Sequence, residues 1–207
     1  MSLAKRRPLT VVLTGGPGGG KTTGIDLLLR VLRDDYKIDA IGFSEASSYL
    51  KLKLGVSGLR SEINLLEFHR EVVRFQDGRE LIDMNSSCAT VVVLDRCVID
   101  SAGFVSQASY TQILDDLGIA VADCFKRYDL VFFLASIAAD YPNVATRFER
   151  PSREAFVQHV KLVEDRFRVA WQGHPRIHLI DPVPVQAEKV LAMAAVISAY
   201  LDRGTRD

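Results

Sequence analysis

Short apolar runs alternate along the chain with longer segments in which apolar residues recur at helical spacing. The short runs cover residues 9–14, 38–43, 89–96, 130–135 and 176–180. Most of them lack polar alternation, which is typical of strands buried on both faces of a parallel sheet. The helical spacing covers residues 21–34, 61–84, 110–125 and 151–171 and a last segment that follows Pro184. This alternation predicts parallel βαβ units with right-handed crossovers in a three-layer α/β/α sandwich.

Three other segments depart from this regular pattern. Glycine and serine indicate a mobile connection over residues 50–61, and Asp77-Gly78 indicates a break in the long helix. Residues 136–153 are expected to form a loop or lid, and Pro151 suits the first turn of the helix that follows.

The sharpest chemical signal lies between the first strand and the first helix. Gly15 opens a loop that closes on Gly20-Lys21-Thr22, in the pattern G-x-x-x-x-G-K-[ST]. Its five glycines let the backbone approach phosphates, Lys21 supplies a charge, and the Thr22 hydroxyl can bind Mg²⁺. A glycine-rich turn with a solvated lysine is the weaker alternative. The predicted binding residues are Gly15, Gly16, Pro17, Gly18, Gly19, Gly20, Lys21, Thr22 and Thr23.

Two charged residues follow the third apolar run. Asp95 ends this run, where an acidic residue of the Mg²⁺ shell is expected; alternatively, it caps the next segment. The planar donor group of Arg96 suits a phosphate or carboxylate, and the alternative is a surface arginine that pairs with a neighbour.

Glu45 follows the second predicted strand. Ligands of open parallel sheets lie beyond the carboxyl ends of the strands, so this residue is placed where chemistry is expected. It is a candidate base for a substrate hydroxyl. The alternative is an acidic side chain in the first turn of a helix, which the helix dipole favours.

Arginines recur at Arg147, Arg150 and Arg153. A helical segment brings residues three apart near one face, and lid arginines can stabilise charge during phosphoryl transfer. The alternative is a solvated basic turn that alternates with Glu149 and Glu154.

Several other residues are weaker candidates. Asp100 is expected to contact substrate or to cap a helix, and Gln76 is a further weak candidate. His69 lies among apolar neighbours on the long predicted helix, and His159 lies on the helix after the arginines. Both are more typical of packed or partly exposed histidines than of ligands. Trp171 is interpreted as a packing residue.

The composition limits the class of protein. A chain of 207 residues suits a single domain over residues 1–207. Its 26 basic and 26 acidic side chains cancel, so no global charge favours nucleic acid or an acidic membrane. Three cysteines match no zinc spacing and indicate a reducing compartment. No apolar run approaches the roughly 20 residues of a membrane span, so a soluble cytoplasmic protein is expected.

Several of these motifs together resemble the NadR/Ttd-type AAA-like domain family of P-loop NTPases. They are Gly15–Thr23, Ser44–Ala46, Leu94–Arg96 with Asp100, Tyr128–Phe133 and the arginines before Glu154. The resemblance covers nearly the whole chain. It implies a kinase-like fold with a five-stranded parallel sheet in the order 2-3-1-4-5, a small arginine-bearing lid around residues 140–153, and ATP or GTP with Mg²⁺.

The same resemblance implies roles for the charged residues. Glu45 would face the acceptor, Asp95 and Arg96 would contribute to metal and phosphate binding, and the loop 181–184 would lie against the nucleotide base. No Asn-Lys-x-Asp guanine signature is present, which disfavours a conventional GTPase.

The function expected from the sequence is a small-molecule kinase that acts on a nucleoside, a nucleotide or a similar acceptor. The catalytic candidates are Lys21, Glu45, Asp95, Arg96, Arg147 and Arg150, and the metal-ligand candidates are Thr22 and Asp95. The alternative is a nucleotide-dependent binding or regulatory module, or a slow NTPase without such an acceptor. A kinase for RNA or DNA ends is disfavoured by the zero net charge.

Overall fold

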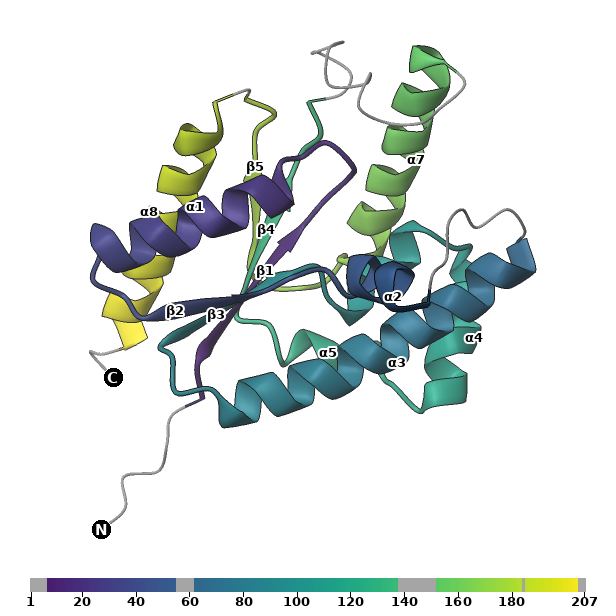
Figure 1. The fold of residues 1–207 in the computed structure, drawn as a ribbon, viewed down its shortest axis with the longest axis horizontal. Coiled ribbons are helices and arrows are strands. Elements are labelled where there is room, and N and C mark those ends of the chain that lie inside the picture. The colour runs from purple at the N-terminus through teal and green to yellow at the C-terminus, as the bar shows by residue number, and fades with distance from the viewer. Residues whose placement is uncertain (1–6, 55–61, 138–151, 184, 205–207) are drawn as a thin grey trace.

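One parallel sheet of five strands lies at the centre of the protein, in the order β2-β3-β1-β4-β5 (Figure 1). The computed structural model describes residues 7–54, 62–137, 152–183 and 185–204. The strands are β1 (Leu9–Thr14), β2 (Ala40–Phe43), β3 (Val91–Asp95), β4 (Leu130–Leu134) and β5 (Ile177–Ile180). All neighbouring strands are parallel, so the predicted sheet and its order are confirmed.

Helices cover both faces of this sheet (Figure 1). The helices are α1 (Lys21–Asp34), α2 (Ala46–Leu54), α3 (Glu62–Ser86), α4 (Gln107–Leu117), α5 (Val121–Phe125), α7 (Arg153–Ala170) and α8 (Gln186–Gly204), with a 3₁₀ helix η1 (Val98–Gly103). Helices α1 and α8 pack on one face, and α3, η1, α4, α5 and α7 cover the other.

The three central strands are buried along their whole length, as their uninterrupted apolar sequences predict. Alternate side chains enter opposite cores because successive residues of a strand point to opposite faces. Val11 and Leu13 of β1 face the core under α1 and α8, while Val12 faces the other core. This packing places the carboxyl ends of β1, β2 and β3 at the same edge of the sheet.

Two predictions about the first half of the chain are wrong. Residues 50–54 belong to helix α2 rather than to a mobile connection, because Ala46 and Leu50 pack against Phe68 and Val72 of α3. The rest of the predicted connection, residues 55–61, lies outside the described residues. The predicted break at Asp77-Gly78 is absent, and α3 continues through it. A helical glycine costs only about 1 kcal/mol relative to alanine, and buried residues on both sides of it offset that cost.

The single helix predicted over residues 110–125 is also wrong, since two helices cover this segment. Gly118 ends α4 in a left-handed conformation, with φ of 67°, and its N–H bonds the last turn of the helix. The side chain of Ser152 accepts a hydrogen bond from Ala155 N at the start of α7, so this helix begins after Ser152 rather than at Pro151.

Residues 138–151 lie outside the described residues. The predicted lid, with Arg147 and Arg150, falls almost entirely on this segment. Within the described ranges, no helix combines the length and hydropathy that crossing a membrane requires.

Candidate functional site

The loop Gly15–Gly20 connects the central strand β1 to the start of α1, as the motif predicts. Gly15 has φ of 118°, and a Cβ atom on it would lie 2.2 Å from the carbonyl oxygen of Leu134. A side chain therefore cannot be added without moving backbone. Gly20 precedes α1 with φ of 85° and provides no side-chain cap. The N–H groups in the first turn of this helix can therefore donate hydrogen bonds to an anion.

Lys21 lies beneath this loop and is almost fully buried. Its Nζ donates hydrogen bonds of 2.8 Å to the carbonyl oxygens of Gly15 and Gly16. Burial, and then the positive charge of Arg96, lower the pKa of Lys21 to about 7. An anionic phosphate in the loop would favour the charged form of this side chain.

Side chains distant in the sequence, from the segment after β4 and from helices α7 and α8, hold the loop in place. Ser136 Oγ donates to the carbonyl oxygen of Pro17 at 2.6 Å, and the backbone N–H of Ser136 donates to Glu164 of α7. Gln186 Nε2 and Lys189 Nζ, both on α8, donate to the carbonyl oxygens of Gly20 and Gly19 at 3.0 and 3.1 Å. No local motif marks these four residues in the sequence, so their contacts with the loop are visible only in the structure.

Thr22 and Asp95 meet at the edge of the loop. Thr22 Oγ1 donates a hydrogen bond of 3.0 Å to Asp95 Oδ2. Asp95 Oδ1 is buried and accepts no hydrogen bond from any described residue. Burial, followed by the charge of Glu45, raises the pKa of Asp95. A hydroxyl beside an unsatisfied carboxylate oxygen is a donor set that suits Mg²⁺, so the residues present fit this ion.

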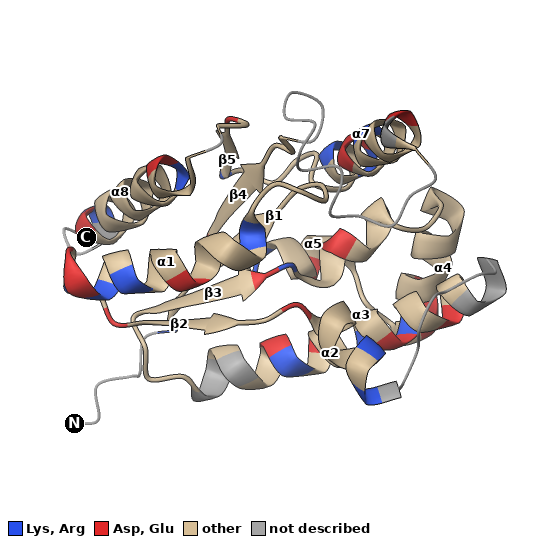
Figure 2. Cartoon of the chain, turned by 45° about the horizontal axis from the view of Figure 1, so that its top comes forward, with Lys and Arg blue, Asp and Glu red and all other residues tan. Residues whose placement is uncertain are grey.

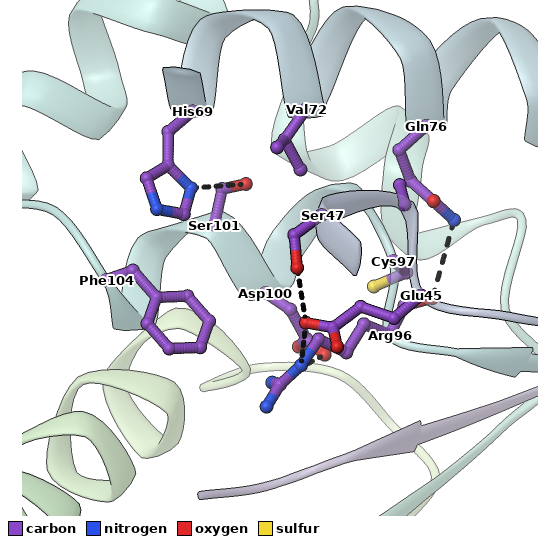
Figure 3. Close-up of a pocket in the computed structure, with 11 residues that line it drawn as sticks. Glu45, Ser47, His69, Val72, Gln76, Arg96, Cys97, Asp100, Ser101 and Phe104 are labelled. Carbon is purple, nitrogen blue, oxygen red and sulfur yellow. Dashed lines mark hydrogen bonds and ion pairs between the residues drawn. The ribbon is translucent and has the colours of Figure 1, made fainter. Parts of the chain in front are cut away.

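Acidic and basic positions gather where β2 and β3 end, next to the start of α1 (Figure 2). Arg96 follows β3, and its Nε lies 2.9 Å from Glu45 Oε1. Its Nη1 lies 3.7 Å from Asp100 Oδ2, so the guanidinium points between two carboxylates (Figure 3). The rings of Phe104 and Phe167 lie against it, with centroids 5.0 and 5.3 Å from Cζ. Arg96 is therefore largely buried rather than a surface arginine.

Glu45 also accepts hydrogen bonds from Ser47 Oγ at 2.7 Å and Ser48 Oγ at 3.1 Å. Burial alone raises the pKa of Glu45, but the charge of Arg96 and the serine hydroxyls outweigh that effect and leave the pKa below its ordinary value. Glu45 is therefore ionised at neutral pH and able to accept a proton or a hydrogen bond.

Asp100 is buried between β1 and α7. Its Oδ1 accepts hydrogen bonds from Thr14 Oγ1 at 2.6 Å and from Trp171 Nε1 at 3.1 Å. Burial raises the pKa of Asp100, although Arg96 acts in the opposite direction. Trp171 packs as predicted, on Phe125 and Tyr128, and in addition holds this carboxylate.

An open cleft joins the loop to this charged cluster. It is lined by loop residues, by Glu45 and Arg96, and by side chains of α2, α3, α7 and α8, namely Lys51, Phe68, His69, Phe156, His159 and Gln186. A narrower pocket lies beside it, bounded by Gln76, Asp100, Ser101 and Phe104 (Figure 3). The structure therefore brings together Lys21, Thr22, Glu45, Asp95 and Arg96. Arg147 and Arg150 lie outside the described residues.

His69 is a packed histidine, as predicted. Its ring stacks on Phe104 and meets Phe68 edge-on, and its Nδ1 lies 3.4 Å from Ser101 Oγ. Burial, and then the charge of Lys51, lower the pKa of His69 to about 4. The imidazole is therefore neutral at physiological pH.

Comparisons with known proteins agree with the fold of the chain. The family model described as an AAA domain matches residues 10–185. No curated protein gives a significant match to the sequence. Among solved structures, a deoxyadenosine kinase from M. mycoides, with products dCMP and a flexible dCDP bound, is similar with a TM-score of 0.62. This similarity covers 92% of the present chain and 100% of the other at 11% identity, so it shows the fold alone.

Proposed function

Because the chain belongs to the AAA domain family and has a fold similar to that of a nucleoside kinase, we propose that it is a small-molecule kinase. It transfers the γ-phosphoryl group of ATP or GTP to a hydroxyl or phosphate of a nucleoside, a nucleotide or a similar acceptor. The observation that carries this proposal is the ion pair of 2.9 Å between Glu45 and Arg96 at the edge of the phosphate-loop cleft. A base candidate and an anion-binding group thus lie beside the donor site.

The donor side rests on the loop. Its backbone N–H groups and Lys21 bind the phosphates of the nucleotide. Thr22 and Asp95 would hold Mg²⁺, and the bound ion would supply positive charge next to these phosphates. Their mutual distance of 3.0 Å and the unsatisfied Asp95 Oδ1 support this assignment.

The acceptor side rests on Glu45 and Arg96. A hydroxyl oxygen of the acceptor forms a bond to the γ-phosphorus, and the bond from that phosphorus to the β,γ-bridging oxygen breaks. The hydroxyl proton passes to Glu45, whose lowered pKa keeps it ionised before the reaction. Arg96 stabilises the charge on the transferring group, and Arg147 and Arg150 from the predicted lid add to that charge stabilisation.

The test is a panel of nucleosides and nucleotides, each incubated with Mg-ATP or Mg-GTP, with release of the nucleoside diphosphate as the readout. At least one acceptor is expected to increase this release. For that acceptor, Glu45→Gln is expected to lower kcat by about 10²- to 10⁴-fold and to leave the Kd for the donor nucleotide unchanged. Glu71→Gln is the matched control, because Glu71 is exposed on α3 and pairs with Arg74.

Two outcomes would count against the proposal. No acceptor-dependent release across a broad panel would remove it, and acceptor-independent hydrolysis would instead support the slow NTPase or regulatory module. Glu45→Gln turnover equal to that of the wild type would remove the role given to Glu45.

A further inference from the structure

The backbone of Arg96 has an uncommon conformation. Its φ is 70°, and Lys37 is the other non-glycine residue with positive φ in the described part of the chain. The backbone of a residue other than glycine is strained at positive φ, so this conformation persists only where neighbouring groups hold it. The strain falls on the residue whose guanidinium pairs with Glu45.

Three hydrogen bonds hold the turn that contains Arg96. The N–H of Arg96 donates to the carbonyl oxygen of Leu13 at 3.1 Å. Its carbonyl oxygen accepts from Gln76 Nε2 at 3.4 Å, and two residues later Val98 N donates to Glu80 Oε1 at 3.1 Å. Gln76 Nε2 also donates to Glu80 Oε1 at 2.9 Å. Helix α3 therefore bonds the turn at two points, at Arg96 through Gln76 and at Val98 through Glu80.

The other oxygen of Glu80 faces the core. Tyr128 donates its hydroxyl to Oε2 at 2.7 Å, and Arg127 Nη1 lies 3.5 Å from the same atom. Glu80 is 1% exposed, and burial raises its pKa to about 7. A buried carboxylate of this kind is costly unless its oxygens are satisfied, and here each oxygen has its own partners.

We propose that Glu80 is a positioning residue whose Oε1, together with Gln76, holds the segment Arg96–Val98 so that the Arg96 guanidinium points at Glu45. The inference rests on the proposed function, since it concerns the residue that would stabilise the transferring phosphoryl group. Glu80 itself is not among the residues that line the cleft or the pocket beside it. It acts through the backbone.

The two oxygens of Glu80 bind different partners, so two variants can separate their effects. Glu80→Met removes both sets of contacts at similar length, whereas Tyr128→Phe removes only the hydroxyl bound to Oε2. Glu80→Met is expected to lower kcat by about 10- to 100-fold, since small displacements of a catalytic group have effects of that size, and to leave the Kd for the nucleotide unchanged. Tyr128→Phe is expected to lower Tm and to leave kcat unchanged.

Conservative variants separate positioning from general stability. Glu80→Gln keeps an oxygen that can accept a hydrogen bond from Val98 N, so its kcat is expected to stay close to the wild-type value. Glu80→Asp keeps a carboxyl group but shortens the side chain, and a lower kcat is expected. This variant tests the proposal if Glu80→Met does not fold. A folded Glu80→Met or Glu80→Asp protein with wild-type kcat would overturn the proposal.

A structural readout keeps this inference distinct from the proposed function. If the wild type shows no acceptor-dependent turnover, the kinase proposal fails, and crystal structures of Glu80→Asp and Tyr128→Phe still test the positioning role. The first is expected to lose the ion pair of 2.9 Å between Arg96 and Glu45, and the second is expected to keep it. An ion pair that is retained in Glu80→Asp would contradict the inference.

Discussion

The hydroxyl of Thr22 lies 3.0 Å from Asp95 Oδ2, although 73 residues separate the two in the sequence. They meet because β1 and β3 are adjacent parallel strands, with Leu13 paired with Asp95. The loop then turns back, so the start of α1 faces the end of β3. This distance is the basis for assigning both residues to one Mg²⁺ site.

Asp95→Asn tests that site. The amide keeps the shape of the side chain but loses its charge, so the Mg²⁺ affinity measured with bound nucleotide is expected to fall by about 10-fold or more. Nucleotide binding in EDTA should be unchanged. Asp123→Asn is a suitable control because Asp123 is exposed on α5 and pairs with Lys126. An unchanged Mg²⁺ dependence in Asp95→Asn would refute the assignment.

Lys21→Ala tests the phosphate loop. Charge-assisted contacts contribute about 1.5–3 kcal/mol, which corresponds to a loss of about 10- to 100-fold in nucleotide affinity. Isothermal titration calorimetry with a non-hydrolysable ATP analogue measures this loss. Lys126→Ala, which removes an exposed lysine of the Asp123 pair, should bind normally. A folded Lys21→Ala protein with wild-type affinity would show that the loop does not use this lysine.

Gly15→Ala tests whether the loop needs glycine for space as well as for conformation. The matched control is Gly173→Ala, since Gly173 has φ of 93° but a Cβ atom there meets nothing within 4 Å. The free energy of unfolding of Gly173→Ala is expected to fall only by the cost of a left-handed alanine, about 1–2 kcal/mol. Gly15→Ala also overlaps the Leu134 carbonyl, which adds about 1–3 kcal/mol. Equal free energies of unfolding in urea would exclude the steric argument.

His69→Gln tests the buried imidazole through pH. The pKa of His69 is lowered to about 4 in the folded protein, from 6.5. The unfolded chain therefore binds more protons between these values, and the wild type loses stability as the pH falls through this window. Relative to the variant, the wild type is expected to lose about 2 kcal/mol between pH 7.5 and pH 5. Urea denaturation at the two pH values measures the difference, and an identical pH response of both proteins would rule the effect out.

The sequence was most informative where a single local pattern is enough to specify the local structure. The motif Gly15–Thr23 and the bounds of α1 follow from the spacing of glycines and apolar residues alone. It was least informative where contacts between helices override local preference. Helix α3 continues through Asp77-Gly78 because its buried residues on both sides are held by the core, whereas Gly118 ends α4.

Local sequence specifies the alternation of strands and helices, the phosphate loop, and charged residues at the ends of two strands, because each of these depends on neighbours along the chain. Which of these groups meet depends on the tertiary structure. It paired Arg96 with Glu45, placed Gln186 and Lys189 against the loop, and set Glu80 behind the strained turn. These contacts join residues from separate elements, so their spacing in the sequence carries no periodic signal.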